Sequence, residues 1–489
     1  MAFLSSLFGD LWSIFLVLLF FGGSIFVHEL GHFLAARRRG AKVERFSIGF
    51  GPAIWSWRGR DGVEYRLAWF PLGGYVMLPQ LADLGPLEGA AAAEADQLPP
   101  VSYATKMIVF AAGAFFNILF AFALATILWA AGQPVAVEDL TARIGIARPQ
   151  IEIDGVKTAP GPAYVAGLRT GDLIVAVDGK SVQSFSDIAQ LIALGGGRDA
   201  QNRPEVAITY ERAGQRLTTT VHPELIGPEK IRDIGVEPAV KLTIESVQAG
   251  SPAEQAGLQV KDVIVAIDGQ PAEYSAFVTE YLRQKAGQPA VFSILRGNAK
   301  LAVTITPRQV TDPATKTAVY RIGVSYRGAL TLRIIHTPPW TQIYQQTVST
   351  WRNLLSVINP HSDIGLSKMS GPVGIGRIFW DASAAGGIRY VLWIAILVNV
   401  NLAIFNLLPV PVLDGGQMAF ATFGKLRGRA LSPGFIATSQ SIFAILIFSM
   451  LIYVTIFGDL RRWIRDAKAD AQAKEAAAEV AKPAAPAKP

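Results

Sequence analysis

Four long apolar segments dominate the hydrophobic pattern of this 489-residue chain. They cover residues 11–36, 107–131, 390–413 and 434–458, and all but the first carry no charge. A helix rises about 1.5 Å per residue, so each segment is long enough to cross a hydrocarbon core of about 30 Å. The pattern predicts a polytopic α-helical membrane protein with four transmembrane helices. Two of them form an N-terminal membrane half over 1–131, and two form a C-terminal membrane half over 389–458.

A pattern of small residues, glycine and aspartate occurs twice between the second and third apolar segments. Residues 161–180 and 251–270 are identical at eleven of twenty positions. Each copy predicts a short helix that ends at glycine, then an apolar strand, then an Asp-Gly turn. Because such a repeat indicates a duplicated domain, we expect two tandem α+β domains, over 136–226 and 240–308.

Shorter patterns fill the remaining segments. Residues 44–78 alternate short apolar runs with glycines, which predicts strands and a β-hairpin region dipping toward the membrane. Helical spacing of apolar residues over 341–358 predicts an amphipathic helix, which can lie on the membrane surface or pack against the second repeat. The composition of 81–100 predicts a mobile loop, and that of 467–489 predicts a disordered tail.

Composition and charge narrow the class of protein. Mean hydropathy is +0.33 and 51% of residues are hydrophobic, which is high for a soluble protein. The net charge of +7 lies in loops beside the apolar segments and in the repeat region. No basic stripe is interleaved with aromatic residues, so the predicted partner is the lipid bilayer and not nucleic acid. The absence of cysteine excludes disulfides and cysteine-bound zinc.

The distribution of basic residues predicts the orientation. Arg37, Arg38, Arg39 and Lys42 follow the first apolar segment, and no basic residue precedes it. The segment is therefore predicted to be a retained first span and not a secretory signal. The positive-inside rule places the loop after it in the cytoplasm and the repeat region outside. The basic cluster near 461–465 favours the opposite side for the C-terminus.

The first apolar segment carries the sequence HELGH at 28–32. On a helix, positions i and i+4 share one face, so His28 and His32 can converge on one metal ion. Glu29 lies beside the first ligand, where it can take a proton from water activated by the ion. It is the only acidic residue within 11–43. Because an intramembrane charge is costly, the motif predicts a functional site; the alternative is a chance match on a buried helix.

A catalytic zinc ion takes three protein ligands and keeps one open position, so two histidines leave the site incomplete. Asp414 is the leading candidate for the third ligand, because it is the only acidic residue within 390–458. Pro409 and Pro411 break the preceding helix, and two glycines follow. The alternative is that Asp414 caps a helix. Weaker candidate ligands in the region of the repeats are His222, His336 and His361.

Further motifs make the likeness to a known family specific. They are GFG at 49–51, PLGGYV at 71–76, SGPVGI at 370–375 and NLLPVPVLDG at 406–415. Together with the histidine motif they resemble the site-2 protease family, and the two repeats resemble PDZ domains of bacterial envelope proteases. The resemblance implies an intramembrane zinc endopeptidase in which His28, His32 and Asp414 hold Zn²⁺ and Glu29 is the general base.

The resemblance also implies how substrate is held. Asn406, with Pro409 and Pro411 in the broken segment after it, is expected to contact substrate. From its glycines, a hairpin with its turn at Gly73 and Gly74 is expected, and it could offer a strand edge to the unwound substrate, since peptides bind readily to an open sheet edge. The PDZ-like domains can bind peptides or substrate termini in the same way.

The implied biology is regulated intramembrane proteolysis. The substrates would be single-pass membrane proteins of the anti-sigma-factor type, cut first on the external side, in a sigma-E stress response, and also remnant signal peptides. The implied location is the bacterial inner membrane, with the PDZ-like domains in the periplasm and the active site toward the cytoplasm.

Two positions depart from the family pattern: Ala114, where proline is usual, and Gln417, where many relatives have histidine. Neither is a proposed ligand. Two alternative functions remain open at this point. A non-catalytic membrane scaffold would use its PDZ pair to bind partners and would have no need of stoichiometric zinc. A metal-ion transporter would need more polar residues within its spans than this chain has.

Overall fold

The computed structural model describes residues 11–81, 98–153, 158–239, 242–272, 275–311, 318–326, 332–468 and 471. The chain divides into two compact units. The first is largely helical and comprises 1–133, 335–352 and 365–489; the second is rich in strands and comprises 134–334 and 353–364. Most of the predicted loop at 81–100 and most of the predicted tail at 467–489 lie outside the described residues.

Four helices of the first unit are long and apolar enough to cross a membrane: Leu11–Arg38, Tyr103–Ala131, Ile388–Asn406 and Pro433–Lys468. The first span contains a π-helical segment, η1 (Leu18–Gly22), followed by α2 (Gly23–Arg38). The second span is α5 (Tyr103–Ala131) and the third is α12 (Ile388–Asn406). The fourth span contains α14 (Pro433–Tyr453) and a second π-helical segment, η5 (Val454–Leu460). The four predicted spans are therefore present. The third ends at Asn406, earlier than predicted, because Pro409 and Pro411 cannot continue the helix.

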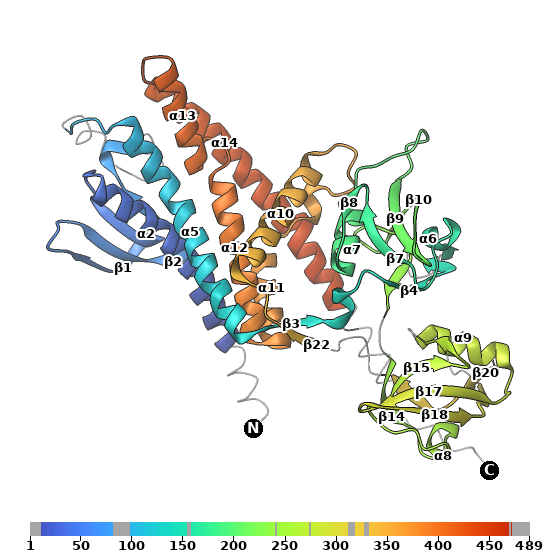
Figure 1. The fold of residues 1–489 in the computed structure, drawn as a ribbon. Helices are drawn as coiled ribbons and strands as arrows, with labels where there is room; N and C mark the ends of the chain where they lie inside the picture. The colour runs from blue at the N-terminus through green and yellow to red at the C-terminus, as the bar shows by residue number, and fades with distance from the viewer. Residues whose placement is uncertain are drawn as a thin grey trace, which may run out of the picture. The chain divides into compact units, whose positions relative to one another are not determined.

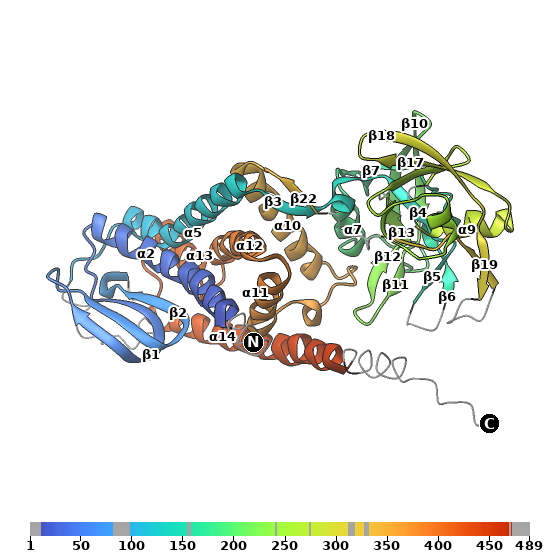
Figure 2. The same cartoon turned by 90° about the horizontal axis from the view of Figure 1, so that it is seen from below.

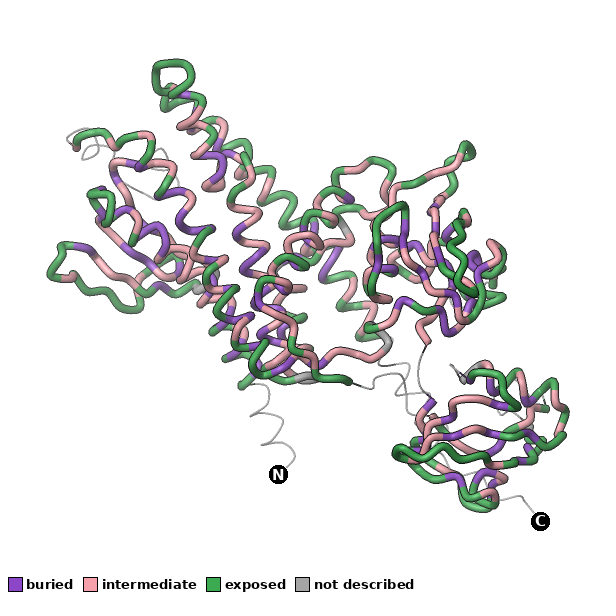
Figure 3. The backbone as a smooth tube through the Cα atoms, viewed as in Figure 1, coloured by how far each residue is buried: buried purple, intermediate pink, exposed green. Residues whose placement is uncertain are grey.

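Helix α5 packs against both α2 and α12 (Figure 1). Ala121, Leu124 and Leu128 of α5 form a buried cluster with Val391 and Ala395 of α12. Half of the apolar window of α12 is buried, but only 11% of the corresponding window of the fourth span is, and Figure 3 shows α14 as mostly exposed. Helices α5 and α12 thus form the interior of the bundle, and the apolar surface of α14 is left for lipid.

The predicted hairpin region forms β1 (Arg45–Arg58) and β2 (Glu64–Met77), which lie beside α2 (Figures 1 and 2). Residues 45–48 pair with 74–77 and also with 64–67, while 55–58 pair with 64–67 from the other side. Two bent strands thus make a sheet of four segments. Among the described residues, 74–77 pair on one side only and form an edge.

The position of the turn in this region differs from the prediction. The hairpin turn lies between the two strands, at residues 59–63, whereas Gly73 and Gly74 lie inside β2. The Asp-Gly pair at 61–62 is a typical turn sequence, and this explains where the chain reverses.

The first unit also contains shorter helices. They are η2 (Pro79–Leu81), α10 (Pro339–Ile358), η4 (Leu366–Lys368), α11 (Pro372–Gly386) and α13 (Asp414–Leu426). The last turns of one of them, α10, belong to the second unit. The amphipathic helix predicted at 341–358 corresponds to α10. Near its C-terminal end, Ser356 donates a hydrogen bond to the carbonyl of Leu194, which belongs to the first repeat and not to the second.

Each repeat forms a small sheet with two helices. The first contains β4 (Ile144–Ala147), β5 (Gln150–Glu152), β6 (Thr158–Pro160), α6 (Pro162–Val165), β7 (Leu173–Val177), β8 (Lys180–Ser181), α7 (Phe185–Ala193), β9 (Val206–Arg212), β10 (Gln215–Val221), β11 (Glu224–Ile226), β12 (Ile231–Asp233) and β13 (Val236–Pro238). Its main sheet has the order β10-β9-β7-β8. Strands β3 (Gln133–Ala136) and β22 (Leu332–Ile335) pair with each other, and η3 (Val137–Leu140) follows β3.

The second repeat contains β14 (Leu242–Val247), α8 (Pro252–Gln255), β15 (Val263–Ile267), β16 (Gln270–Pro271), α9 (Ser275–Lys285), β17 (Ala290–Arg296), β18 (Ala299–Ile305), β19 (Arg308–Thr311), β20 (Ala318–Arg321) and β21 (Val324–Tyr326). The main sheet has the order β18-β17-β15-β14-β21. In both repeats the Asp-Gly turn has positive φ at both residues, at 178–179 and at 268–269, as a tight hairpin requires.

The repeated aspartate has the same structural role in both copies. Asp262 is buried and accepts two hydrogen bonds from Arg296, at 2.8 and 2.7 Å, and one from the backbone N–H of Gln259 at 2.8 Å. Asp172 bonds Arg212 and the N–H of Arg169 in the same manner. Burial alone would raise the pKa of Asp262, but these hydrogen bonds hold it below its ordinary value of 3.8. The repeat in sequence therefore encodes a repeated ion pair.

We expect Asp262→Asn to destabilise a fragment covering residues 240–326 by about 1–3 kcal/mol at pH 7, because charge-assisted hydrogen bonds at a buried carboxylate are lost. A depressed pKa in the folded state gives stability that is present at neutral pH and is lost as the pH falls through that pKa. The difference between wild type and variant should therefore shrink below pH 3.8. Urea unfolding across a pH series measures it. Glu280→Ala, which removes an exposed ion pair with Arg283, is the control with a small expected effect, and an equal effect of both substitutions would contradict the assignment.

Candidate metal centre

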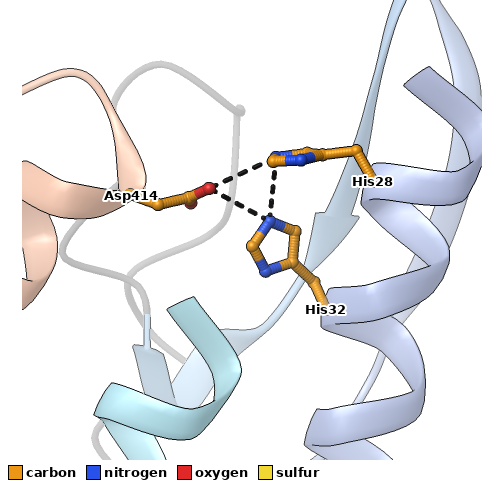
Figure 4. A group of neighbouring side chains, drawn as sticks. All are labelled: His28, His32 and Asp414. Atoms are coloured by element: carbon orange, nitrogen blue, oxygen red, sulfur yellow. Dashed lines mark hydrogen bonds and ion pairs between the residues drawn. The ribbon is translucent and has the colours of Figure 1, made fainter. Parts of the chain in front are cut away.

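Helix α2 places His28 and His32 on one face, one turn apart. The two ring centroids are 4.7 Å apart and the rings are nearly perpendicular, at 85°. Their Nε2 atoms lie 3.1 Å from each other. Figure 4 shows both rings pointing away from the helix toward Asp414. The spacing of the motif thus gives two nitrogen donors that converge on one point.

Asp414 comes from a distant part of the chain, at the first residue of α13. Its Oδ2 lies 3.2 Å from Nε2 of His28 and 3.4 Å from Nε2 of His32. The chain between α12 and α13 folds back closely: a Cβ at Gly415 would overlap the backbone of Leu407, and one at Gly416 would overlap the backbone of Val410. The double glycine therefore allows the close turn that brings Asp414 to the histidines.

The geometry of these three atoms fits a tetrahedral ion. Zinc bound at about 2.0–2.1 Å in tetrahedral geometry separates its ligand atoms by about 3.3 Å, and the three separations here are 3.1, 3.2 and 3.4 Å. Oδ2 of Asp414 is buried and accepts no hydrogen bond of regular geometry. Among the described residues, His28, His32 and Asp414 are the one cluster of three such donors. The donor set of two imidazoles and a carboxylate is one that zinc uses in catalytic sites.

Glu29 and the edge of the sheet lie together. A Cβ placed on Gly74 would be 2.9 Å from Cγ of Glu29, so the backbone of β2 passes directly beside this carboxylate. A Cβ on Gly73 would overlap the ring of Phe50. The two glycines are therefore positions where β2 contacts its neighbours without room for a side chain, and Gly74 is the one at the candidate site.

The other predicted substrate residues lie at the end of α12. Asn406 is the last residue of that helix, and its Nδ2 is 3.5 Å from Nε2 of His28. Pro409 and Pro411 lie in the irregular segment before α13, where the carbonyl of Pro411 accepts a hydrogen bond of 2.9 Å from Nε2 of Gln417. The structure thus brings Asn406 to the histidines, while the prolines shape the segment that carries Asp414.

The three weaker histidine candidates lie elsewhere. Nδ1 of His336 is 2.6 Å from the carbonyl of Trp129, and Nδ1 of His222 is 3.1 Å from that of Pro204. His361 lies in the second unit. None of them belongs to the described cluster of donors.

One face of α5, which was not predicted from the sequence, contacts the histidines. The carbonyl of Val109 is 2.8 Å from Nδ1 of His32, and the side-chain amide of Asn117 is 3.3 Å from Nδ1 of His28. Between them, a Cβ on Gly113 would collide with both imidazole rings. A lone amide in an otherwise apolar span is the signal that could have pointed to Asn117.

Known proteins are similar to this chain over most of its length. Peptidase family M50 matches residues 16–450. A curated relative from Salmonella typhi, named regulator of sigma E protease, is 32% identical over 474 residues, which covers 92% of this chain and 99% of the relative. The regulator of sigma-E protease RseP of Escherichia coli K12 is 29% identical over 483 residues, with the same coverage of both chains.

Solved structures match a smaller part. The crystal structure of the PDZ domain of an SdrC-like protein from Listeria innocua is 26% identical and covers 18% of this chain and 93% of that one, with a TM-score of 0.16.

The family match extends over most of the chain and includes both segments that supply the candidate ligands. The chain belongs to peptidase family M50 and is a zinc metalloprotease with four candidate membrane spans and two repeated domains.

Proposed function

We propose that this protease cuts peptide bonds within transmembrane segments, at a zinc ion held by His28, His32 and Asp414. The observation that carries the proposal is the convergence of three donor atoms within 3.4 Å, on helices that are apolar enough to lie in a membrane. Zinc, when bound, supplies Lewis acidity that lowers the pKa of water and polarises a carbonyl group.

Glu29 is the proposed general base. It takes a proton from the attacking water and later delivers it to the leaving amine. The backbone of Gly74 lies beside this carboxylate, so a substrate strand paired with the edge at 74–77 would pass close to it. The bond to be cut and the base are thereby brought to the same place.

A helical substrate must unwind before it can be cut, because its peptide groups are hydrogen-bonded within the helix. The exposed N–H and C=O groups then need partners inside the membrane. Residues 74–77 offer such groups along an open edge, and Asn406 offers a side-chain amide near the metal ligands. Pro409 and Pro411 keep the segment after Asn406 out of a helix.

The proposed substrates are single-pass membrane proteins of the anti-sigma-factor type that have already been shortened on one side, together with remnant signal peptides. The names of the curated relatives support the first of these. We place the protein in a bacterial inner membrane with its PDZ-like domains in the periplasm, as the basic residues at 37–42 favour.

Glu29→Gln should abolish cleavage and leave zinc bound. The amide has the shape of the carboxylate but cannot accept the proton, and loss of a general base costs about 10²–10⁴-fold in rate. Turnover of a membrane-embedded substrate and metal content are measured on the same preparation. Glu64→Gln, which changes a carboxylate paired with Arg45, is the control and should keep most of the activity. Turnover of the Glu29 variant close to that of wild type would remove it as the base.

Asp414→Ala should lower zinc content as well as activity, because two imidazoles alone hold the ion weakly. Metal analysis of the purified protein after dialysis against a chelator measures the effect. Asp381→Ala, on the exposed surface of α11, is the matched control and should retain stoichiometric zinc. Full zinc occupancy in the Asp414 variant would exclude this residue as a ligand.

We further propose that the PDZ-like domains act as a size filter. The proposed ligands lie in the membrane halves, whereas both repeats lie between the second and third spans. Replacing residues 136–308 with a flexible linker should preserve cleavage of a substrate with a short external stub and newly permit cleavage of an untrimmed one.

Both substrates are compared with both enzymes in the same membranes, and zinc content shows that the variant is folded. A zinc-loaded deletion variant that still refuses the untrimmed substrate would disprove the filter. Loss of the short-stub substrate as well would show that the repeats recruit substrate instead.

A further inference from the structure

Three positions on α5 form the surface against which the candidate metal ligands pack. Val109, Gly113 and Asn117 are spaced by four residues, so they lie on one face of the helix. Val109 and Asn117 are fully buried. A Cβ on Gly113 would lie 2.6 Å from Cε1 of His28, so only glycine lets the imidazoles approach α5 this closely. The Nδ1 atom of each ring contacts a polar group of this face, that of Val109 or that of Asn117.

The carbonyl of Val109 determines the tautomer of His32. A carbonyl oxygen can only accept a hydrogen bond, so Nδ1 of His32, 2.8 Å away, must carry the proton. In a neutral imidazole the other nitrogen then has a free lone pair. That nitrogen is Nε2, which faces Asp414. His32 is therefore held in the form that can bind a metal ion.

His28 has no backbone carbonyl in the corresponding place. Its Nδ1 faces the side-chain amide of Asn117 at 3.3 Å. With the amide nitrogen toward the ring, His28 would have to accept at Nδ1 and carry its proton on Nε2, and it could not be a ligand. With the amide oxygen toward the ring, Nδ1 donates and Nε2 is free. A half-turn of the amide group exchanges the two arrangements.

The surroundings of Asn117 do not oppose the second arrangement. Its Oδ1 is buried and has no hydrogen-bond partner as drawn, so no donor holds the oxygen away from His28. An amide inside an apolar span is costly unless it is hydrogen-bonded, and the His28 ring is the partner that the structure offers it. Binding of a metal ion by Nε2 selects the arrangement with the oxygen facing the ring.

We propose that Asn117 is a positioning residue whose side-chain oxygen accepts the Nδ1 proton of His28 and so presents Nε2 to zinc. With the carbonyl of Val109, it gives each histidine one fixed acceptor on α5. Loss of a hydrogen-bond partner of a metal-bound histidine typically lowers the metal affinity about 10- to 100-fold. The inference rests on the proposed zinc site.

Asn117→Leu removes the acceptor and keeps the branched arrangement of four side-chain heavy atoms, and Asn117→Asp keeps an acceptor. The control is Asn399→Leu: Asn399 is also fully buried, also has an unpartnered Oδ1, and also contacts α2, through the hydroxyl of Ser24. The zinc dissociation constant of each full-length protein is measured in detergent by competition with a chelator. The tautomer of the histidines is read from the ¹⁵N spectrum of histidine-labelled protein.

We expect Asn117→Leu to weaken zinc binding about 10- to 100-fold, and Asn117→Asp and Asn399→Leu to stay close to wild type. In zinc-loaded wild type both motif histidines should show a hydrogen-bonded Nδ1–H, and in the zinc-loaded leucine variant one of these N–H signals should shift to the position of an N–H without an acceptor.

Equal zinc affinity of Asn117→Leu and wild type would overturn the inference. So would equal weakening by leucine and aspartate, because that result means that Asn117 only fills space. If the leucine variant does not fold, the aspartate variant and the ¹⁵N spectrum of zinc-loaded wild type decide, since a His28 Nδ1–H without a hydrogen bond contradicts the proposal. A wild-type chain that binds no zinc would instead refute the proposed function.

Discussion

The close approach of α2 and α5 determines where both imidazoles lie. Gly31, inside the histidine motif, faces the backbone of Ala112, where a Cβ would be 2.5 Å from the carbonyl oxygen. Gly113 faces the rings themselves. Helices in a membrane gain little from hydrophobic association, so small residues that let backbones approach are a main source of their packing energy. The glycines that stabilise this helix pair therefore also bring the polar groups of α5 to the histidines.

The position of the third donor, Asp414, depends on an interruption between two helices, whereas the histidines lie on a continuous helix. Helix α12 ends at Asn406 and α13 begins at Asp414, and the segment between satisfies part of its backbone locally, with N–H groups of Val410 and Leu413 bonded to carbonyls within it. Non-helical backbone is tolerated in a membrane protein where such bonds or a polar cavity replace the helical ones. A continuous helix supplies two donors and a broken one supplies the third.

The three candidate metal ligands could be predicted from the sequence, because two of them follow a helical spacing and the third is a rare charged residue in an apolar segment. The i, i+4 positions of His28 and His32 fix their shared face, and Asp414 was recognisable as the one carboxylate in a long uncharged stretch. Asn117 was missed because an uncharged amide hardly alters the hydropathy of its span. The position of Gly74 beside Glu29 could not be predicted, since it depends on pairing between distant residues.

The sequence of α10 left two positions open, the membrane surface and the second repeat, because an apolar stripe does not identify the surface that it packs against. The structure gives one contact near its C-terminal end, the hydrogen bond from Ser356 to the carbonyl of Leu194 in the first repeat. An apolar stripe thus predicts the buried face of a helix more readily than its partner.

Residues 45–48 pair with a strand segment on each side, and this limits where the chain can accept an insertion or a deletion. These residues are held between 64–67 and 74–77, so their register is fixed on both sides. An insertion in the turn at 59–63 would leave both pairings intact. A single residue added or lost between 68 and 73 would shift the edge by one place and turn its side chains to the opposite face, and a deletion would in addition put Tyr75, which has a Cβ, against Glu29. Relatives of this chain should therefore vary in length at the hairpin turn and keep a constant length at the bend that precedes Gly74.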